Sequence, residues 1–94
     1  MNIDQEMKLW EERSNDEFGT ILKQIKEACI DYFVAEEDEN GILSTPIDDY
    51  IAAYAVYGNR KRISTSVRGI LFNYDILGNH KDIEDLVMKL CKLC

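Results

Sequence analysis

The sequence lacks the long apolar segments that place a chain in a membrane. Its longest unbroken apolar run, residues 50–57, falls far short of the roughly 20 residues that a transmembrane helix needs. Residues 1–6 contain no basic stretch followed by apolar residues, so no secretory signal is visible. We therefore expect a cytoplasmic protein that does not associate with membranes.

Cysteine and histidine are also scarce, with 3 and 1 in the chain. Cys91 and Cys94 have the spacing of half a zinc site or of a redox pair, but no second Cys/His pair at ligand spacing accompanies them. The motif also ends a predicted helix, whereas a redox CxxC usually begins one. An odd number of cysteines makes a poor disulfide framework. We expect no metal site and only incidental or structural cysteines.

No arrangement of residues typical of an active site is visible. A nucleophile–His–acid arrangement would have to use His80, which no local pattern links to a cysteine. The 5 glycines match neither a P-loop nor a dinucleotide fingerprint. The carboxylates at 36–39 and 48–49 lie in or beside a polar loop, where a solvated surface is the simplest interpretation. We expect a protein that is not an enzyme and needs no cofactor.

What the sequence does contain is typical of one globular domain, residues 1–94. The chain has 94 residues, of which 46% are hydrophobic and 31% charged, with a single proline. Five segments repeat apolar residues at helical spacing, at about residues 4–13, 14–35, 46–57, 64–77 and 79–92. The prediction is an all-α fold, a small bundle of four to five short helices.

Capping residues set the expected ends of these helices. Ser14 and Glu17 have the spacing of a capping box, Thr45 precedes Pro46 as an N-cap, and Ser64 can cap the fourth segment. Gly58 is a natural residue to follow the third segment. Four consecutive acids at 36–39 oppose a helix macrodipole, so the second helix should end near residue 35. Because Asn-Gly favours hairpins, residues 32–35 and 41–44 could instead pair as a short β-ribbon near residues 32–44.

Charge is distributed unevenly along the chain. Residues 1–49 contain 14 acidic and 4 basic residues, a net charge of −10, whereas residues 50–94 contain 4 acidic and 7 basic residues, a net charge of +3. Charge patterns of this kind steer association with partners and do not determine the fold.

The first hypothesis is that the acidic half binds a protein with a basic surface. The negative face would be formed by Glu36, Glu37, Asp38, Glu39, Asp48 and Asp49, with Tyr50 or Tyr57 as an apolar anchor. Tyrosines on an apolar stripe are more often core residues, but we expect at least one to have its hydroxyl at the surface. Such a face can cover a nucleic-acid-binding or nuclease site. Small inhibitor proteins such as immunity proteins and antitoxins have this profile.

The alternative is a DNA-binding transcriptional regulator with a helix-turn-helix at residues 46–77. The fourth segment would be the recognition helix and residues 58–63 the connection. The contacts would come from Arg60, Lys61, Arg62, Thr65, Ser66 and Arg68. An isoelectric point near 4.6 argues against it, and residues 60–62 could equally be a solvated loop or pair with acids.

A third interpretation is a homo-oligomer in which the acidic half of one copy meets the basic half of another. A two-fold axis would use both contacts, whereas other arrangements give rings or filaments.

Overall fold

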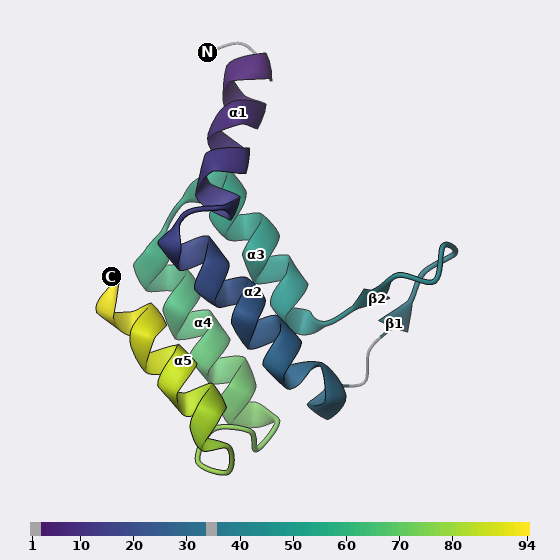
Figure 1. Ribbon diagram of the computed structural model, residues 1–94, viewed down its shortest axis with the longest axis vertical. Coiled ribbons are helices and arrows are strands. Elements are labelled where there is room, and N and C mark those ends of the chain that lie inside the picture. The colour runs from purple at the N-terminus through teal and green to yellow at the C-terminus, as the bar shows by residue number, and fades with distance from the viewer. Residues whose placement is uncertain (1–2, 34–35) are drawn as a thin grey trace.

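The computed structural model describes residues 3–33 and 36–94, which form five α-helices, one 3-10 turn and a short β-hairpin (Figure 1). In chain order these elements are α1 (Ile3–Ser14), α2 (Glu17–Cys29), η1 (Ile30–Tyr32), β1 (Glu36–Glu37), β2 (Leu43–Ser44), α3 (Pro46–Tyr57), α4 (Arg60–Asn73) and α5 (Lys81–Lys92). The predicted all-α bundle is confirmed. None of the helices in this described part combines the length and the apolar character that crossing a bilayer requires.

Four of the helices pack in a closed ring around one apolar core. α2 contacts α3 and α5, and α4 contacts the same two helices. Each helix of the ring contributes buried side chains to this core. In α2, α4 and α5 these side chains recur every three or four residues, so that they share one face of the helix. Among them are Phe18, Leu22, Ile25, Ile47, Val67, Leu71, Ile83 and Leu90. Burying one such side chain stabilises the fold by about 1.5–3 kcal/mol.

α1 and the β-hairpin project from this ring (Figure 1). α1 contains no buried residue, and it is held at its end by Arg13, whose Nη1 donates to the carbonyls of Ala55 (3.1 Å) and Val56 (2.8 Å). These carbonyls lie in the last turn of α3, where backbone oxygens have no helical partner. The two projections raise the radius of gyration to 13.7 Å, compared with about 12 Å for a compact domain of this length.

The predicted starts of the second and fourth helices are wrong. The N–H of Asn15 donates to the carbonyl of Glu11 at 3.1 Å, which extends α1 through Ser14. Asp16 therefore caps α2 in place of Ser14, and its carboxylate accepts the N–H of Gly19 at 2.8 Å. Asn59 likewise caps α4 by accepting the N–H of Arg62 at 3.1 Å.

Two consequences follow for the region around α4. Ser64 lies buried in the second turn of α4, where its hydroxyl donates to the carbonyl of Lys61 at 3.0 Å. The basic residues 60–62, predicted as part of a loop, form the first turn of the helix instead. The connection between α3 and α4 therefore contains only Gly58 and Asn59.

The segment between α2 and α3 forms a ribbon in a different register from the predicted one. α2 ends at Cys29 rather than near residue 35. Glu36 pairs with Ser44 and Glu37 with Leu43, so the turn contains residues 39–41. Gly41 has a φ of 78°, as three-residue hairpin loops require. In the predicted pairing of residues 32–35, Tyr32 belongs to η1, and residues 34 and 35 lie outside the described residues.

Candidate functional site

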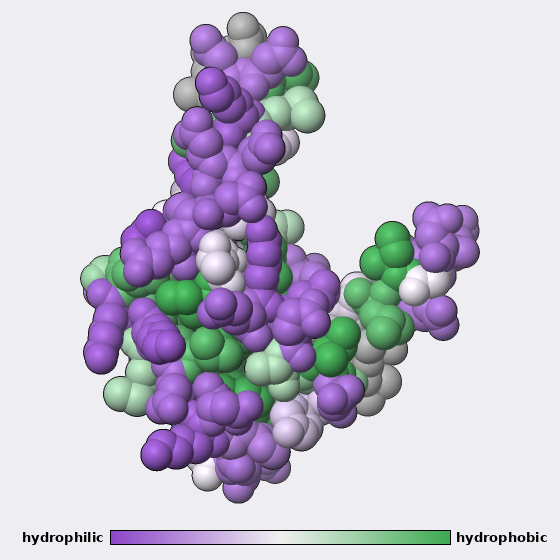
Figure 2. Space-filling model, viewed as in Figure 1, coloured by the Kyte–Doolittle hydropathy of each residue, from purple (hydrophilic) through white to green (hydrophobic). Residues whose placement is uncertain are grey.

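The β-hairpin carries exposed carboxylates and exposed apolar side chains together. Glu37, Asp38 and Glu39 are exposed, while Ile42 and Leu43 keep 62% and 45% of their surface accessible. Figure 2 shows the hairpin as a separate arm, with apolar surface next to a hydrophilic tip. We call residues 36–44 the acidic hairpin. Each strand of the ribbon has only two residues, and a two-stranded hairpin is at best marginally stable by itself.

Ile42 and Leu43 were not among the residues predicted to bind a partner. The available signal was two large apolar residues directly after an Asn-Gly turn, on a ribbon too short to be stable alone. Their solvent exposure depends on where the ribbon points, and the apolar pattern does not show that.

Two of the predicted acidic residues stabilise local structure. The Asp38 carboxylate accepts the N–H groups of Asn40 (2.8 Å) and Ile42 (2.9 Å), which closes the turn. Asp48 accepts the N–H of Thr45 at 2.6 Å and pairs with Lys26 Nζ at 2.6 Å. Burial raises the pKa of Asp48, but Lys26 and the Thr45 N–H outweigh this effect and hold the pKa below its usual value. Asp48 is therefore engaged by the protein itself, whereas Asp49 is exposed.

The structure places the two predicted tyrosine anchors at different distances from the acidic hairpin. α3 begins directly after β2, whereas Tyr57 is its last residue. The 12 residues of α3 rise about 18 Å. Tyr57 is 78% exposed, and Tyr50 is half-buried against the core. Both line a groove of about 760 Å³ between α3 and α4. Tyr57 therefore lies at the opposite end of α3 from the acidic hairpin, whereas Tyr50 lies in the second turn of that helix.

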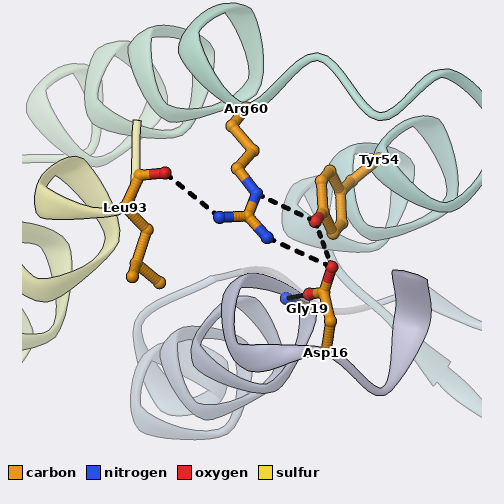
Figure 3. Close-up of polar contacts among 5 residues, drawn as sticks. All are labelled: Asp16, Gly19, Tyr54, Arg60 and Leu93. Carbon is orange, nitrogen blue, oxygen red and sulfur yellow. Dashed lines mark hydrogen bonds and ion pairs between the residues drawn. The ribbon is translucent and has the colours of Figure 1, made fainter. Parts of the chain in front are cut away.

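Arg60 stands at the centre of a polar cluster that joins all four helices of the ring (Figure 3). Its Nε donates to Tyr54 Oη at 3.1 Å, its Nη1 to the Leu93 carbonyl at 3.1 Å, and its Nη2 lies 3.3 Å from Asp16 Oδ2. The Tyr54 hydroxyl donates to the same carboxylate oxygen at 2.5 Å. Arg60 was a predicted phosphate contact, but in the structure its guanidinium holds α2, α3 and the end of α5 against α4.

The same cluster sets the charge of Asp16. Burial raises the pKa of this carboxyl group, whereas the Gly19 N–H, the Tyr54 hydroxyl and the Arg60 guanidinium lower it. The lowering contributions are larger in sum, so the pKa of Asp16 lies below its usual value of 3.8. Asp16 is therefore ionised at neutral pH and can retain Arg60.

The other basic residues of α4 remain at the surface. Lys61, Arg62 and Arg68 are exposed, and within the described part of the chain the ion pairs are Lys26–Asp48 and Arg60–Asp16. Thr65 donates its hydroxyl to the carbonyl of Lys61 at 2.9 Å, and Ser66 lines the groove with Arg62. A helix-turn-helix usually has a turn of three to four residues, and the two-residue link here is that of an αα-hairpin.

Cysteine and histidine are dispersed in the structure. His80 stacks on the ring of Tyr32 with centroids 4.2 Å apart. Cys29 is buried, and burial together with the charge of Asp82 raises its pKa to about 11. Residues 3–33 and 36–94 contain no group of three or more His, Cys, Asp or Glu side chains that could hold a metal ion.

No family model matches the chain, and no curated protein or solved structure is significantly similar to it. Its function is therefore inferred from the surfaces described above.

Proposed function

We propose that the protein is a small binding protein whose acidic hairpin recognises a basic surface on a protein partner. A natural target is a nucleic-acid-binding or nuclease site, because such surfaces are built to attract phosphates. An inhibitor of the immunity-protein or antitoxin type would act by covering that site.

One observation carries the proposal: the hairpin projects from the bundle and presents both charge and apolar surface at its end. Glu37 and Glu39 are exposed, whereas the side chain that accepts the N–H groups of Asn40 and Ile42 in the turn is that of Asp38. Carboxylates placed in this way accelerate the approach of a basic partner. Ile42 and Leu43 then supply the apolar contact area that lengthens the lifetime of the complex, at about 25 cal/mol per Å² removed from water.

The bundle supplies the rigid base that such an arm needs. The second strand of the hairpin, β2, runs directly into α3, where Thr45 and Asp48 form a capping box. The Lys26–Asp48 pair ties this point to α2. The base of the hairpin is thereby fixed on two helices, which lowers the entropy lost when the tip binds.

The test compares two charge-reversal variants with the same net charge. The hairpin variant carries Glu37→Lys and Glu39→Lys, and the control carries Glu11→Lys and Glu12→Lys on the exposed surface of α1. Each protein is immobilised and used to capture proteins from the source cells, which are identified by mass spectrometry. We expect a basic protein that the wild type and the control retain and the hairpin variant loses.

Stopped-flow measurements with that partner then separate the contribution of the hairpin carboxylates from that of the hairpin's apolar side chains. The hairpin variant should associate at least about tenfold more slowly and with a weaker dependence on salt. An Ile42→Ser, Leu43→Ser variant should instead dissociate faster with little change in the association rate. Equal capture by the hairpin variant and the wild type would show that this arm is not the contact surface.

A further inference from the structure

The groove between α3 and α4 has the opposite character from the acidic hairpin. One wall presents the rings of Tyr50 and Tyr57, and the other presents Arg62 and Ser66. The groove continues past Lys61 along the start of α4. Among the residues that the structure describes, none of those lining either part carries a carboxylate. The Asn59 side chain caps the start of α4 by accepting the N–H of Arg62. The positive charge of the groove comes from the side chains of Lys61 and Arg62.

We propose that this groove binds the acidic hairpin of a second copy of the chain. The proposal rests on the proposed function in one respect, namely that the hairpin is a binding element. It goes further by assigning a receptor for the hairpin when no other partner is present.

Charge complementarity is the first support. The exposed hairpin side chains include Glu37, Asp38 and Glu39, and the hairpin contains no basic residue. The described residues that line the groove include Lys61 and Arg62 and no acid. Neither Lys61 nor Arg62 is paired with a carboxylate in the part of the chain that the structure describes. Both sets of charges are therefore available to each other when two copies meet.

Apolar complementarity is the second support. Ile42 and Leu43 are exposed beside the hairpin carboxylates, and the exposed Tyr57 lines the groove together with Arg62. Tyrosine and arginine are the residues that most often anchor interfaces. A hairpin lying in the groove would place its aliphatic side chains on the tyrosine rings and its carboxylates near the cations.

The contact has to form between copies because one copy cannot make it alone. The hairpin leaves the bundle at the start of α3 and points away from it (Figure 1), whereas Tyr57 lies at the far end of the same helix. A two-fold arrangement lets each copy supply one hairpin and one groove, so the contact is made twice and the assembly closes. A basic partner would then compete with the second copy for the hairpin.

The test uses complementary charge reversals. The hairpin variant is Glu37→Lys with Glu39→Lys, and the groove variant is Lys61→Glu with Arg62→Glu. The matched controls reverse the same number of exposed charges elsewhere: Glu11→Lys with Glu12→Lys, and Lys89→Glu with Lys92→Glu. Circular dichroism and urea unfolding establish that each variant is folded, and sedimentation equilibrium at low and high salt measures self-association.

We expect the wild type and both controls to dimerise at low salt and to dissociate at high salt. Each binding-surface variant alone should have a dimer dissociation constant at least about tenfold higher. An equimolar mixture of the two variants should form a heterodimer, because each altered hairpin meets an altered groove of opposite charge. Only a direct contact between the two surfaces predicts this rescue.

A wild-type chain that stays monomeric at submillimolar concentration, or a mixture that stays monomeric, would overturn the proposal. So would a monomeric wild type that binds a labelled oligonucleotide through Lys61 and Arg62, which would assign the groove to nucleic acid. The groove variant separates this result from the proposed function. If it still captures the basic partner through its intact hairpin, the proposed function stands whatever the state of self-association.

Discussion

Charged residues that look alike in this sequence have two distinct roles in the structure. Some hold helices together, and others remain exposed at the surface. Arg60, Lys61 and Arg62 are consecutive and basic, yet only Arg60 reaches the cluster with Asp16 and Tyr54. Its partners Tyr54, Leu93 and Asp16 are 6, 33 and 44 residues away in the chain. Residues at such distances are brought together by the fold, so no local pattern could have separated Arg60 from its neighbours.

Replacing Arg60 tests this division. Arg60→Met should lower the free energy of unfolding by about 1 kcal/mol, because it removes hydrogen bonds to Tyr54, Asp16 and the Leu93 carbonyl. The value is modest because the Arg60 and Asp16 side chains remain 37% and 29% exposed. Lys61→Met is the control and should change stability by less than about 0.5 kcal/mol. Urea unfolding followed by circular dichroism measures both; equal losses would contradict the assignment.

The sequence predicted the presence of the five helices better than the residues at which they begin and end. Apolar residues at helical spacing indicate the five helices, because each buries one face in the common core. Ser14 and Asp16 are both good N-cap residues two positions apart, and the capping-box spacing of Ser14 with Glu17 favoured the wrong one. Asp16 is selected because its carboxylate also meets Tyr54 and Arg60.

The candidate site was predictable only in its charges. A run of acids at 36–39 is visible in the sequence. The pairing of Asp48 with Lys26 depends on how α2 and α3 pack, and the sequence does not show it. The packing of α3 against α4 creates the groove between these helices. The sequence predicts each of the two helices, but it does not show that they lie side by side and form a groove.

The link between α3 and α4 can be tested with a pair of glycine substitutions. Gly58 has a φ of 71°, and a Cβ there would lie 2.9 Å from Nε of Arg13. Gly58→Ala should therefore lower the free energy of unfolding by about 1–2 kcal/mol, with part of the loss at the α1 contact. Gly69 lies inside α4, where a Cβ would meet nothing within 4 Å. Gly69→Ala should raise the free energy of unfolding by about 0.5–1 kcal/mol.

Both variants are measured by urea unfolding under identical conditions. The opposite signs are the diagnostic result, since both changes add the same methyl group and differ only in backbone conformation and surroundings. A loss of stability in Gly69→Ala would show that α4 is covered on that side or is not helical there.

At the scale of the whole molecule, two ion pairs connect the helices of the ring. Lys26–Asp48 joins α2 to α3, and Arg60–Asp16 joins α4 to the start of α2. In both pairs the carboxylate also caps a helix, through Thr45 in one case and Gly19 in the other. Protonation of either carboxylate would weaken a helix end and a contact between helices at the same time.

This arrangement predicts acid sensitivity with a definite direction. Burial acts to raise the pKa of Asp16 and of Asp48, but hydrogen bonds and the paired cations lower both values below the usual 3.8. The folded state therefore binds fewer protons than the unfolded state in the acidic range. The stabilisation is complete above about pH 4–5 and is lost as pH falls through the lowered pKa values.

Neutralising both carboxylates should separate their contribution from the general effect of acid. An Asp16→Asn, Asp48→Asn variant should be less stable than the wild type near neutral pH, and its urea midpoint should fall less steeply between about pH 5 and about pH 3. A control with Glu39→Gln and Asp49→Asn removes the same charge from exposed positions and should keep the wild-type slope. Parallel curves for the double variant and the wild type would show that other groups control the acid transition. A reduced slope in that variant alone would locate the acid sensitivity at the two points where α2 is joined to α3 and α4.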